Sequence, residues 1–462
     1  MFTGMHKDGI KIEDFASMCQ GKLYFGAPSV KVFGLSTDSR NIGKGEAFVA
    51  IKGEHFDGNY FISKAKDNNA SCAVVSRIDE SCPLPQILVD DTVRAIGHFA
   101  KEYKKMFRIM TVAITGSVGK TTTKQYTHAV LSSHCATMKT EGNLNSDIGL
   151  PLTLTNLSSE YKAAVLEMGM SSLGEISELS KIAEPNISII TNIGCSHLEY
   201  LHTRENILKA KMEIIDGMKD GSVLLLNGDN EYLREADSKK IRKLYFGINK
   251  NNDFIATNIR MGTDETLYDV ITPDDDMIRD LKILSYGYDH IYDSLAAVIC
   301  GILSGLSDDE IRTGLLNFQP AKMRKHIRQS RDMTLIEDYY NACPESVEAA
   351  LEFLNHKFSG RKAAILGDMK ELGEQSPYYH YGIGKNAAEN GVKILFAVGD
   401  YSDDIKRGAE ENGMDGLSVR TYGSTDEFID NISSAKEMLN SGDCILIKAS
   451  RSMHFERISK QL

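Results

Sequence analysis

The segment TGSVGKTTT contains the residue types that bind phosphate groups. Gly116 and Gly119 permit a tight loop whose backbone N–H groups point inward, and Lys120 can reach the terminal phosphates of a nucleotide. Thr121 offers a hydroxyl group to a magnesium ion, and a helix that begins here directs its positive end at the phosphates. Common phosphate loops carry another glycine five positions before Gly119, where this chain has Ile114. A glycine turn without a ligand is the alternative, but Gly-x-x-Gly-Lys-Thr between a strand and a helix favours nucleotide binding.

Two further polar side chains follow predicted strands and could complete a metal site. Glu167 ends the apolar run AAVLE, and His197 follows the apolar run ISIIT. Because the carboxyl ends of parallel strands meet at one edge of a sheet, both side chains are expected beside the phosphate loop. A carboxylate there can hold magnesium, and a neutral imidazole can complete the metal shell. For either residue alone, a helix-end carboxylate or a solvated loop histidine is the alternative.

One lysine and two asparagines are less decisive. Lys211 lies in the predicted helix HTRENILKAKMEII, two positions from Lys209 and therefore on a different face. Taken alone, this pattern is typical of a solvated surface lysine. Asn143 and Asn145, in GNLNSDIGLPLTL, could hydrogen-bond a polar substrate or serve turn geometry, and the residue types favour neither.

Strands that alternate with helices would position these residues. Strands buried on both faces and separated by helices indicate a parallel sheet covered by helices on each side. The expected strands are Met110–Thr115, Ala163–Glu167, Ile187–Thr191 and Ser222–Asn227 in the middle of the chain, and AAILGD, ILFAVGD and CILIKAS in its last third.

The fold class is therefore α/β, with three domains. Residues 1–107 predict a small α/β N-terminal domain, with EAFVAIKG and CAVVS as strands and a charged helix, Lys101–Arg108, before the boundary. Residues 108–320 predict a central domain with a mostly parallel sheet and the phosphate loop. Residues 321–462 predict a smaller C-terminal Rossmann-like domain. The last two domains, joined near Pro320, would enclose a cleft that can close on a ligand.

Composition restricts the class of protein. A chain of 462 residues suits two or three domains, and a net charge of −11 argues against a nucleic-acid-binding surface. Eight cysteines without a C-x-x-C pair predict reduced, buried thiols rather than disulfides or a zinc site. The first residues have no apolar signal core, and the longest apolar run, Leu295–Gly305, is too short to span a bilayer. We expect a cytoplasmic protein without membrane insertion.

Eight motifs occur in an order that resembles the Mur ligase family. They are TGSVGKTTTK, GNLNSDIGLPLTL, LEMGMSSLGEI, TNIGCSHLEYL, RENILKAKMEI, DYYNACPESV, LGDMKELG and KASRSM. Together they extend over nearly the whole chain and over all three predicted domains. The family uses the short phosphate loop without the extra glycine, which accounts for Ile114.

The resemblance implies that residues 108–320 form a central P-loop ATPase domain and that the N-terminal domain holds a UDP-sugar. The stretch GLSTDSRNI is similar to the uridine-binding segment of the family, and AFVAIKGEHFDGNYFI is similar to a second uridine-side motif. The residues implied are Ser36, Thr37, Asp38, Ser39, Arg40, Gly53, Phe56, Asp57 and Gly58.

The chemistry implied by the resemblance is an ATP-dependent amide ligation that adds D-alanyl-D-alanine to UDP-N-acetylmuramoyl-tripeptide. A terminal carboxylate attacks the γ-phosphate of ATP, and the incoming amine then displaces phosphate from the acyl phosphate. Lys120 and two magnesium ions would neutralise the developing charge. Thr121 and Glu167 would hold one ion and His197 the other, and Lys211 would carry a carbamate made with CO₂.

The resemblance also implies the remaining contacts, and we expect a monomer. The implied ATP-binding residues are Gly116, Ser117, Gly119, Lys120, Thr121, Thr122, His290, Arg324 and Asp338. Substrate contacts are implied for Asn143, Asn145, Tyr340, Asn341, Pro344 and Ser346, and Lys448, Ser450 and Arg451 lie in the KASRSM motif. Each of these C-terminal residues could instead serve interdomain packing.

The sequence departs from the family pattern on the adenine and amine sides. The departures are Ser146, Cys343 and Asp293, which replace asparagines, Ala449, which replaces a glycine, and Asp289–His290, which stand in place of a His-Asn pair. Two alternatives therefore stand beside the dipeptide ligase. One is a related ligase with another amine acceptor, and the other is a nucleotide-binding homologue without turnover.

Overall fold

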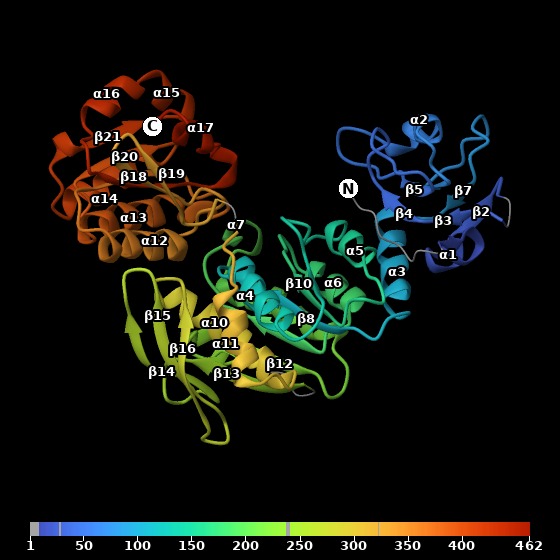
Figure 1. The fold of residues 1–462 in the computed structure, drawn as a ribbon. Coiled ribbons are helices and arrows are strands. Elements are labelled where there is room, and N and C mark those ends of the chain that lie inside the picture. Colours follow the sequence, from blue (N-terminus) through green and yellow to red (C-terminus); the bar gives the residue numbers. More distant parts are fainter. Residues whose placement is uncertain (1–8, 27–28, 237–240, 322) are drawn as a thin grey trace.

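Three sheet-based units follow one another along the chain (Figure 1). The structure is a computed structural model that describes residues 9–26, 29–236, 241–321 and 323–462. The parts of the predicted domains at residues 1–8, 27–28, 237–240 and 322 lie outside the described residues.

The N-terminal unit is built on a five-stranded sheet of order β2-β7-β6-β5-β4, in which only β2 is antiparallel to its neighbour. The strands are β2 Lys22–Tyr24, β4 Gly34–Ser36, β5 Glu46–Val49, β6 Cys72–Val75 and β7 Gln86–Leu88, with a separate pair β1 Ile10–Lys11 and β3 Lys31–Val32. The helices are α1 Ile12–Met18, a 3-10 turn Gly58–Phe61, α2 Ile62–Asp67 and α3 Thr92–Lys104.

The central unit contains a nine-stranded sheet of order β16-β15-β14-β13-β12-β11-β8-β10-β9. Its strands are β8 Met110–Thr115, β9 Thr137–Lys139, β10 Ala163–Glu167, β11 Ile187–Ile190, β12 Val223–Asn227, β13 Arg242–Gly247, β14 Phe254–Met261, β15 Thr266–Ile271 and β16 Met277–Ile283. Its helices are α4 Lys120–Ser132, α5 Gly149–Leu154, α6 Glu175–Ala183, α7 Leu198–Leu201, α8 Arg204–Met212, a 3-10 turn Glu213–Gly217, α9 Glu231–Arg234, α10 Tyr288–Leu303 and α11 Asp308–Leu316.

The middle of this sheet is parallel, and its last two pairings, β14–β15 and β15–β16, are antiparallel. Strand β8 lies between β10 and β11, so the segments that follow these three strands share one sheet edge. The strands are buried on both faces because α4 and α10 cover one side and α5 and α6 the other (Figure 1).

The C-terminal unit has a six-stranded sheet of order β17-β18-β22-β19-β20-β21, parallel except for the β17–β18 hairpin. The strands are β17 His326–Ser330, β18 Met333–Glu337, β19 Lys362–Gly367, β20 Ile394–Val398, β21 Val419–Tyr422 and β22 Cys444–Lys448. The helices are α12 Pro344–Lys357, α13 Ser376–Glu389, α14 Ser402–Glu411, α15 Thr425–Asp430, α16 Ile432–Glu437 and α17 Glu456–Ser459, with 3-10 turns at Gly373–Gln375, Gly416–Ser418 and Arg451–Met453.

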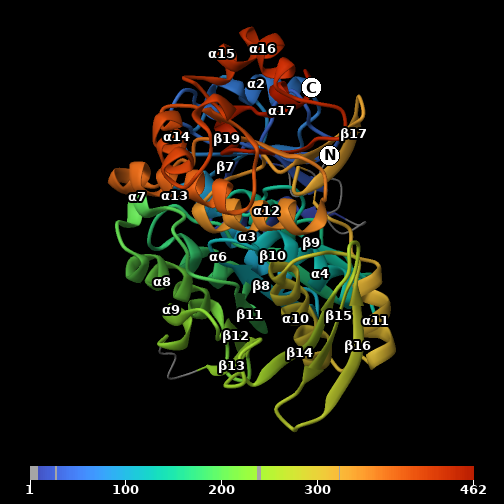
Figure 2. The ribbon, with the colours of Figure 1, turned by 90° about the vertical axis from the view of Figure 1, so that its left-hand side faces the viewer.

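The N-terminal and C-terminal units contact two different surfaces of the central unit. Helix α3 of the N-terminal unit packs against α5 and α6. Helix α12 of the C-terminal unit faces the central unit, and this arrangement is visible in both views (Figures 1 and 2). The C-terminal unit meets the central sheet at the edge that holds the phosphate loop, where Arg324 donates to Thr121, and the N-terminal unit packs on the face covered by α5 and α6.

Candidate active site

The phosphate loop connects β8 to α4. Gly119 has φ 86° and is the N-cap of α4, and a Cβ at this position would lie 2.7 Å from Asp293 Oδ1. Gly116 has φ 153°, and a Cβ there would lie 1.8 Å from Thr191 Oγ1. Both positions therefore require glycine for conformation and for space. Lys120 begins the helix, and its Nζ donates to the backbone oxygen of Gly116 at 2.6 Å. The lysine side chain is therefore folded back against the phosphate loop.

Glu167 is the centre of a buried polar cluster at the end of β10. Its Oε2 accepts a hydrogen bond from Thr121 Oγ1 at 3.0 Å and lies 2.9 Å from Lys124 Nζ. Its Oε1 accepts a hydrogen bond from Asn145 Nδ2 at 3.0 Å. Burial opposes ionisation, but the charges of Lys124 and Lys120 outweigh it and hold the pKa of Glu167 below its usual value. The carboxylate is therefore ionised beside the threonine that was predicted to bind metal.

His197 occupies the N-cap position of the short helix α7, and its side chain lines the pocket between the central and C-terminal units. Burial lowers the pKa of the imidazole, and the nearby Lys211 lowers it further, so the ring is neutral at pH 7. Its Nδ1 lies 2.6 Å from Glu371 Oε2 of the C-terminal unit, but the two groups are not aligned as a hydrogen bond. A neutral imidazole can act as a metal ligand.

Lys211 is buried, with 1% of its surface exposed, so the alternative of a solvated surface lysine is wrong. Helix α8 packs its apolar side, with Ile207 and Ala210, against the interior, and Lys211 lies on this buried side. Burial lowers the pKa of Lys211 well below its usual value, and the charge of Lys120 adds to this effect. Among the residues that the structure describes, no carboxylate pairs with Lys211. Burial therefore favours the uncharged, nucleophilic form of this amine.

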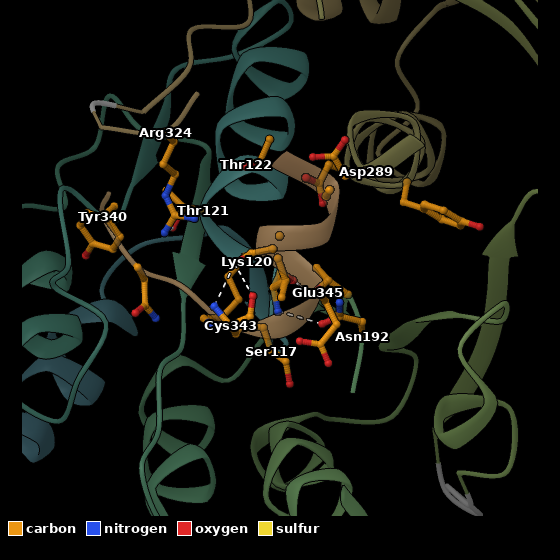
Figure 3. Close-up of a pocket in the computed structure, with 18 of the residues that line it drawn as sticks. Ser117, Lys120, Thr121, Thr122, Asn192, Asp289, Arg324, Tyr340, Cys343 and Glu345 are labelled. Atoms are coloured by element: carbon orange, nitrogen blue, oxygen red, sulfur yellow. Dashed lines mark hydrogen bonds between the residues drawn. The ribbon is translucent and has the colours of Figure 1, made fainter. Parts of the chain in front are cut away.

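Lys120, Glu167 and His197 line a cavity of about 740 Å³ between the central and C-terminal units (Figure 3). The lining includes most of the residues predicted for the nucleotide, the metal and the amine. They are Ser117, Gly119, Lys120, Thr121, Thr122, Asn145, Glu167, His197, His290, Arg324, Asp338, Tyr340, Asn341, Ser346 and Lys448, joined by the departures Ser146, Asp289, Asp293 and Cys343. Gly116, Lys211, Asn143, Pro344, Ser450, Arg451 and Ala449 do not line it.

The cavity extends from the phosphate loop to an aromatic and charged region on α10. The ring of Tyr126 stacks on Phe318 at 3.7 Å, and its hydroxyl lies 3.1 Å from His290 Nδ1. Burial lowers the pKa of His290 to about 4, so this imidazole is neutral. Next to it, Asp289 forms a 2.7 Å ion pair with Lys325 of the C-terminal unit.

One turn further along α10, the carboxyl group of Asp293 accepts a 2.6 Å hydrogen bond from Thr123. Burial raises the pKa of Asp293 well above its usual value, and Asp289 adds to this effect. Burial therefore favours the protonated carboxyl group, which presents both a donor and an acceptor, as the asparagine amide of the family pattern also does.

Residues of the C-terminal unit reach directly into the site. Arg324 donates to Thr121 Oγ1 at 3.2 Å, and its guanidinium lies over the ring of Tyr340 at 4.6 Å. Asp338 forms a buried 2.8 Å ion pair with Lys448, whose Nζ also donates to the backbone oxygen of Asn341. The unit therefore contributes cations to the pocket wall.

The residues predicted to bind uridine lie outside this pocket. Asp38 pairs with Arg40 at 2.9 Å, and Asp57 accepts a hydrogen bond from the backbone of Asn59. These segments are in the N-terminal unit, which Figure 1 shows on the right, apart from α12 of the C-terminal unit on the left. The residues concerned are Ser36, Thr37, Asp38, Ser39, Arg40, Gly53, Phe56, Asp57 and Gly58.

Sequence reasoning missed three charged residues of the site. Lys124 follows Lys120 by one helical turn, and this i, i+4 spacing could have identified it. Lys325, next to Arg324, pairs with Asp289, and no local pattern indicates this contact. Glu345 lies between Pro344 and Ser346 in the DYYNACPESV motif and lines the pocket.

Three features define a nucleotide-binding enzyme of the phosphate-loop class. They are a phosphate loop with two required glycines, a parallel sheet, and a second α/β unit that completes the pocket. Three family models match the chain: "Mur ligase family, catalytic domain" over residues 31–104, "Mur ligase middle domain" over 114–301, and "Mur ligase, glutamate ligase domain" over 323–451. The chain belongs to the Mur ligase family, whose members are ATP-dependent, ADP-forming ligases.

Proteins named UDP-N-acetylmuramoyl-tripeptide--D-alanyl-D-alanine ligase are similar over almost the full length. The one from Bacillus subtilis (strain 168) is 35% identical over 93% of both chains, and the one from Escherichia coli (strain K12) is 33% identical over 93% of both. A crystal structure of MurF from Acinetobacter baumannii matches with a TM-score of 0.89 at 30% identity over 98% of both chains. MurF ligase from Thermotoga maritima in complex with ADP matches with a TM-score of 0.81 at 27% identity, covering 92% of this chain and 96% of that one.

Proposed function

We propose that the chain joins D-alanyl-D-alanine to UDP-N-acetylmuramoyl-tripeptide at the expense of ATP, a step in the synthesis of the peptidoglycan precursor. The observation that carries the proposal is the phosphate loop with Thr121 and Glu167 in hydrogen-bond contact, inside a cavity that the C-terminal unit completes. The similarity to ligases of this name over more than nine-tenths of the chain supports the choice of substrates.

The proposed reaction has two steps. The terminal carboxylate of the tripeptide attacks the γ-phosphorus of ATP, and ADP leaves. The amine nitrogen of the dipeptide, after its ammonium form has lost a proton to solvent, attacks the acyl carbon. Phosphate leaves with the electrons of the C–O bond, and the nitrogen releases a second proton as the amide forms. Lys120 would leave its contacts with the loop carbonyls to bind the β- and γ-phosphates, and Arg324 would add charge from the opposite wall.

Magnesium fits this site when phosphate oxygens complete its coordination. Among the described residues, no group of three His, Cys, Asp or Glu side chains converges as a ready-made metal site. Mg²⁺ typically takes few protein ligands and several from phosphates and water. Thr121 and Glu167 would hold one ion and His197 the second, and bound magnesium would neutralise charge on the γ-phosphate.

A carbamate on Lys211 would supply a further anion near these ions. Carbamate formation requires an uncharged amine, and burial without a carboxylate partner favours that form. An unmodified ammonium here would instead repel the metal ions.

The remaining assignments complete the proposal. Residues 1–107, 108–320 and 321–462 would be the UDP-sugar-binding, ATP-binding and closing domains, a division supported by the family matches within each range. The UDP-sugar would contact Ser36–Arg40 and Asp57, and the peptide and amine would contact Asn143, Asn145, Asn341 and Ser346. We expect a cytoplasmic protein, which agrees with eight free cysteines, seven of them buried. We also expect a monomer. No helix within the described ranges has the length and apolar character to cross a membrane.

A phosphate-release assay with ATP, UDP-N-acetylmuramoyl-tripeptide and a panel of amines tests the proposal. Release that requires both the tripeptide and D-alanyl-D-alanine is expected. Release with a different amine would support the related ligase with another acceptor. Nucleotide binding without release for any amine would support the homologue that has lost turnover.

A further inference from the structure

The carboxylate of Glu345 lies in the pocket with only one of its oxygens partnered. Glu345 is the second residue of α12, and its Oε1 accepts a hydrogen bond from the backbone N–H of Cys195 at 2.8 Å. Its Oε2 is buried and has no hydrogen-bond partner, and no ion pair to Glu345 occurs among the described residues. Leaving a charged oxygen buried and unpaired is unfavourable, which indicates that a partner arrives with the ligands.

The position of Glu345 is fixed relative to the phosphate loop. The backbone N–H of Gly194 donates to Ser117 Oγ at 2.9 Å, and the next residue, Cys195, donates to Glu345. A Cβ at Gly194 would lie 2.6 Å from Glu345 Oε1, so this carboxylate rests directly against the backbone that contacts the phosphate loop. Figure 3 shows Glu345 in the pocket together with Ser117, Lys120 and Asn192.

The start of α12 is itself held in place. The backbone N–H of Cys343 donates to Ser346 Oγ at 3.0 Å, and this hydroxyl donates back to the Cys343 carbonyl. The carboxylate of Glu345 is therefore preorganised at the boundary between the two units rather than free in solvent.

The partner that would compensate a buried carboxylate oxygen most strongly is a donor that carries positive charge. A nucleotide phosphate would be repelled by the carboxylate. In the proposed reaction, the organic cation that enters the site is the ammonium group of the incoming dipeptide. We propose that Glu345 Oε2 binds this ammonium group and that Glu345 is a specificity-determining residue for the amine substrate. This inference rests on the proposed function.

The variant Glu345→Gln separates recognition of the ammonium group from a purely structural role. Its amide oxygen can still accept the hydrogen bond from Cys195, but its charge is absent. We expect the KM for D-alanyl-D-alanine to rise about tenfold or more, while the KM values for ATP and UDP-N-acetylmuramoyl-tripeptide change less than about twofold. The matched control is Glu348→Gln, which removes the same charge from an exposed residue of α12 lining the same pocket. Its KM for the dipeptide should stay within about twofold of the wild-type value.

Hydroxylamine provides the second measurement because it is an uncharged nucleophile at neutral pH. Its nitrogen attacks the acyl carbon of the acyl phosphate, phosphate leaves, and a hydroxamate forms without any dipeptide. Glu345→Gln should form hydroxamate at the wild-type rate. An unchanged KM for the dipeptide, an equal effect of Glu348→Gln, or a shifted magnesium requirement would each overturn the inference. If the wild-type protein forms no hydroxamate from ATP and the tripeptide, the proposed function itself fails, and the role of Glu345 fails with it.

Discussion

At Lys211, burial directly affects the protonation of the amine on which the proposed carbamate depends. Its amine is enclosed by the protein without a carboxylate partner, and burial lowers its pKa well below the usual value. The unfolded chain therefore binds one more proton than the unmodified folded chain at every pH between the two pKa values. It follows that stability rises with pH across that window and levels off near the ordinary lysine pKa of about 10.4.

The variant Lys211→Met tests this pH dependence. In CO₂-free buffer it should be more stable than the wild-type protein at pH 7, because no buried amine needs to lose a proton. The stability difference, measured by urea unfolding from pH 7 to 10, should shrink as the pH rises. A difference that does not depend on pH would contradict the buried, neutral amine.

The carbamate proposal predicts chemical rescue at the same position. Lys211→Ala removes the amine and leaves space in which a small carboxylate can take the place of the carbamate. We expect at least about a 100-fold loss of ligase activity, the size typical for losing a group that supports bound charge. Acetate or formate should restore part of the activity, and chloride at equal ionic strength should not. Full activity of the variant without added carboxylate would rule out the carbamate.

At the scale of elements, the phosphate loop depends on the packing of α10 against α4. Gly119→Ala would place a methyl group 2.7 Å from Asp293 Oδ1 at a positive φ. We expect a destabilisation of about 1–2 kcal/mol from the backbone strain, together with loss of ATP binding in a calorimetric titration. Gly174→Ala is the control, because Gly174 is also a helix N-cap with positive φ but has nothing within 4 Å of its Cβ position. ATP binding that survives in Gly119→Ala would show that the loop does not need its present shape.

Strands were predicted correctly where burial was continuous and were missed where buried and exposed residues alternate. The runs Met110–Thr115 and Ala163–Glu167 are strands with the predicted bounds, because they are apolar throughout and end at polar loops. The antiparallel strands β14–β16 were not predicted, because their alternating, half-exposed residues lack such a run. The helix predicted at Lys101–Arg108 was wrong at both ends. Asp91 caps α3 at its start, and α3 ends at Lys104.

At the scale of the whole molecule, the pocket requires two units to meet. The ion pair between Asp289 and Lys325 joins α10 to the C-terminal unit, and Lys325 is largely buried. Lys325→Met leaves Asp289 uncompensated and should destabilise the protein by about 1–2 kcal/mol, a discounted value because Asp289 is 39% exposed. The double variant Asp289→Asn, Lys325→Met should recover part of this loss in denaturant unfolding. Additive losses would mean that the pair contributes no coupling.

The residues of the site could be predicted only in part, because some of their contacts join positions that are far apart in the sequence. Thr121, Glu167 and His197 could be assigned because each follows a recognisable strand and parallel strands share an edge. The burial of Lys211 could not be read from its helix, whose pattern is mostly polar. Glu345 contacts Cys195 across 150 positions, and only the folded chain brings them together.

The central claim is that a carboxylate becomes an acyl phosphate at this phosphate loop. It is tested most directly with UDP-N-acetylmuramoyl-tripeptide whose terminal carboxylate carries ¹⁸O in both oxygens. Carboxylate attack on the γ-phosphorus followed by loss of phosphate transfers one carboxylate oxygen to the product phosphate. Mass spectrometry of the phosphate released during ligation should therefore find one ¹⁸O atom per molecule. Phosphate without ¹⁸O, formed while ligation proceeds, would contradict the account.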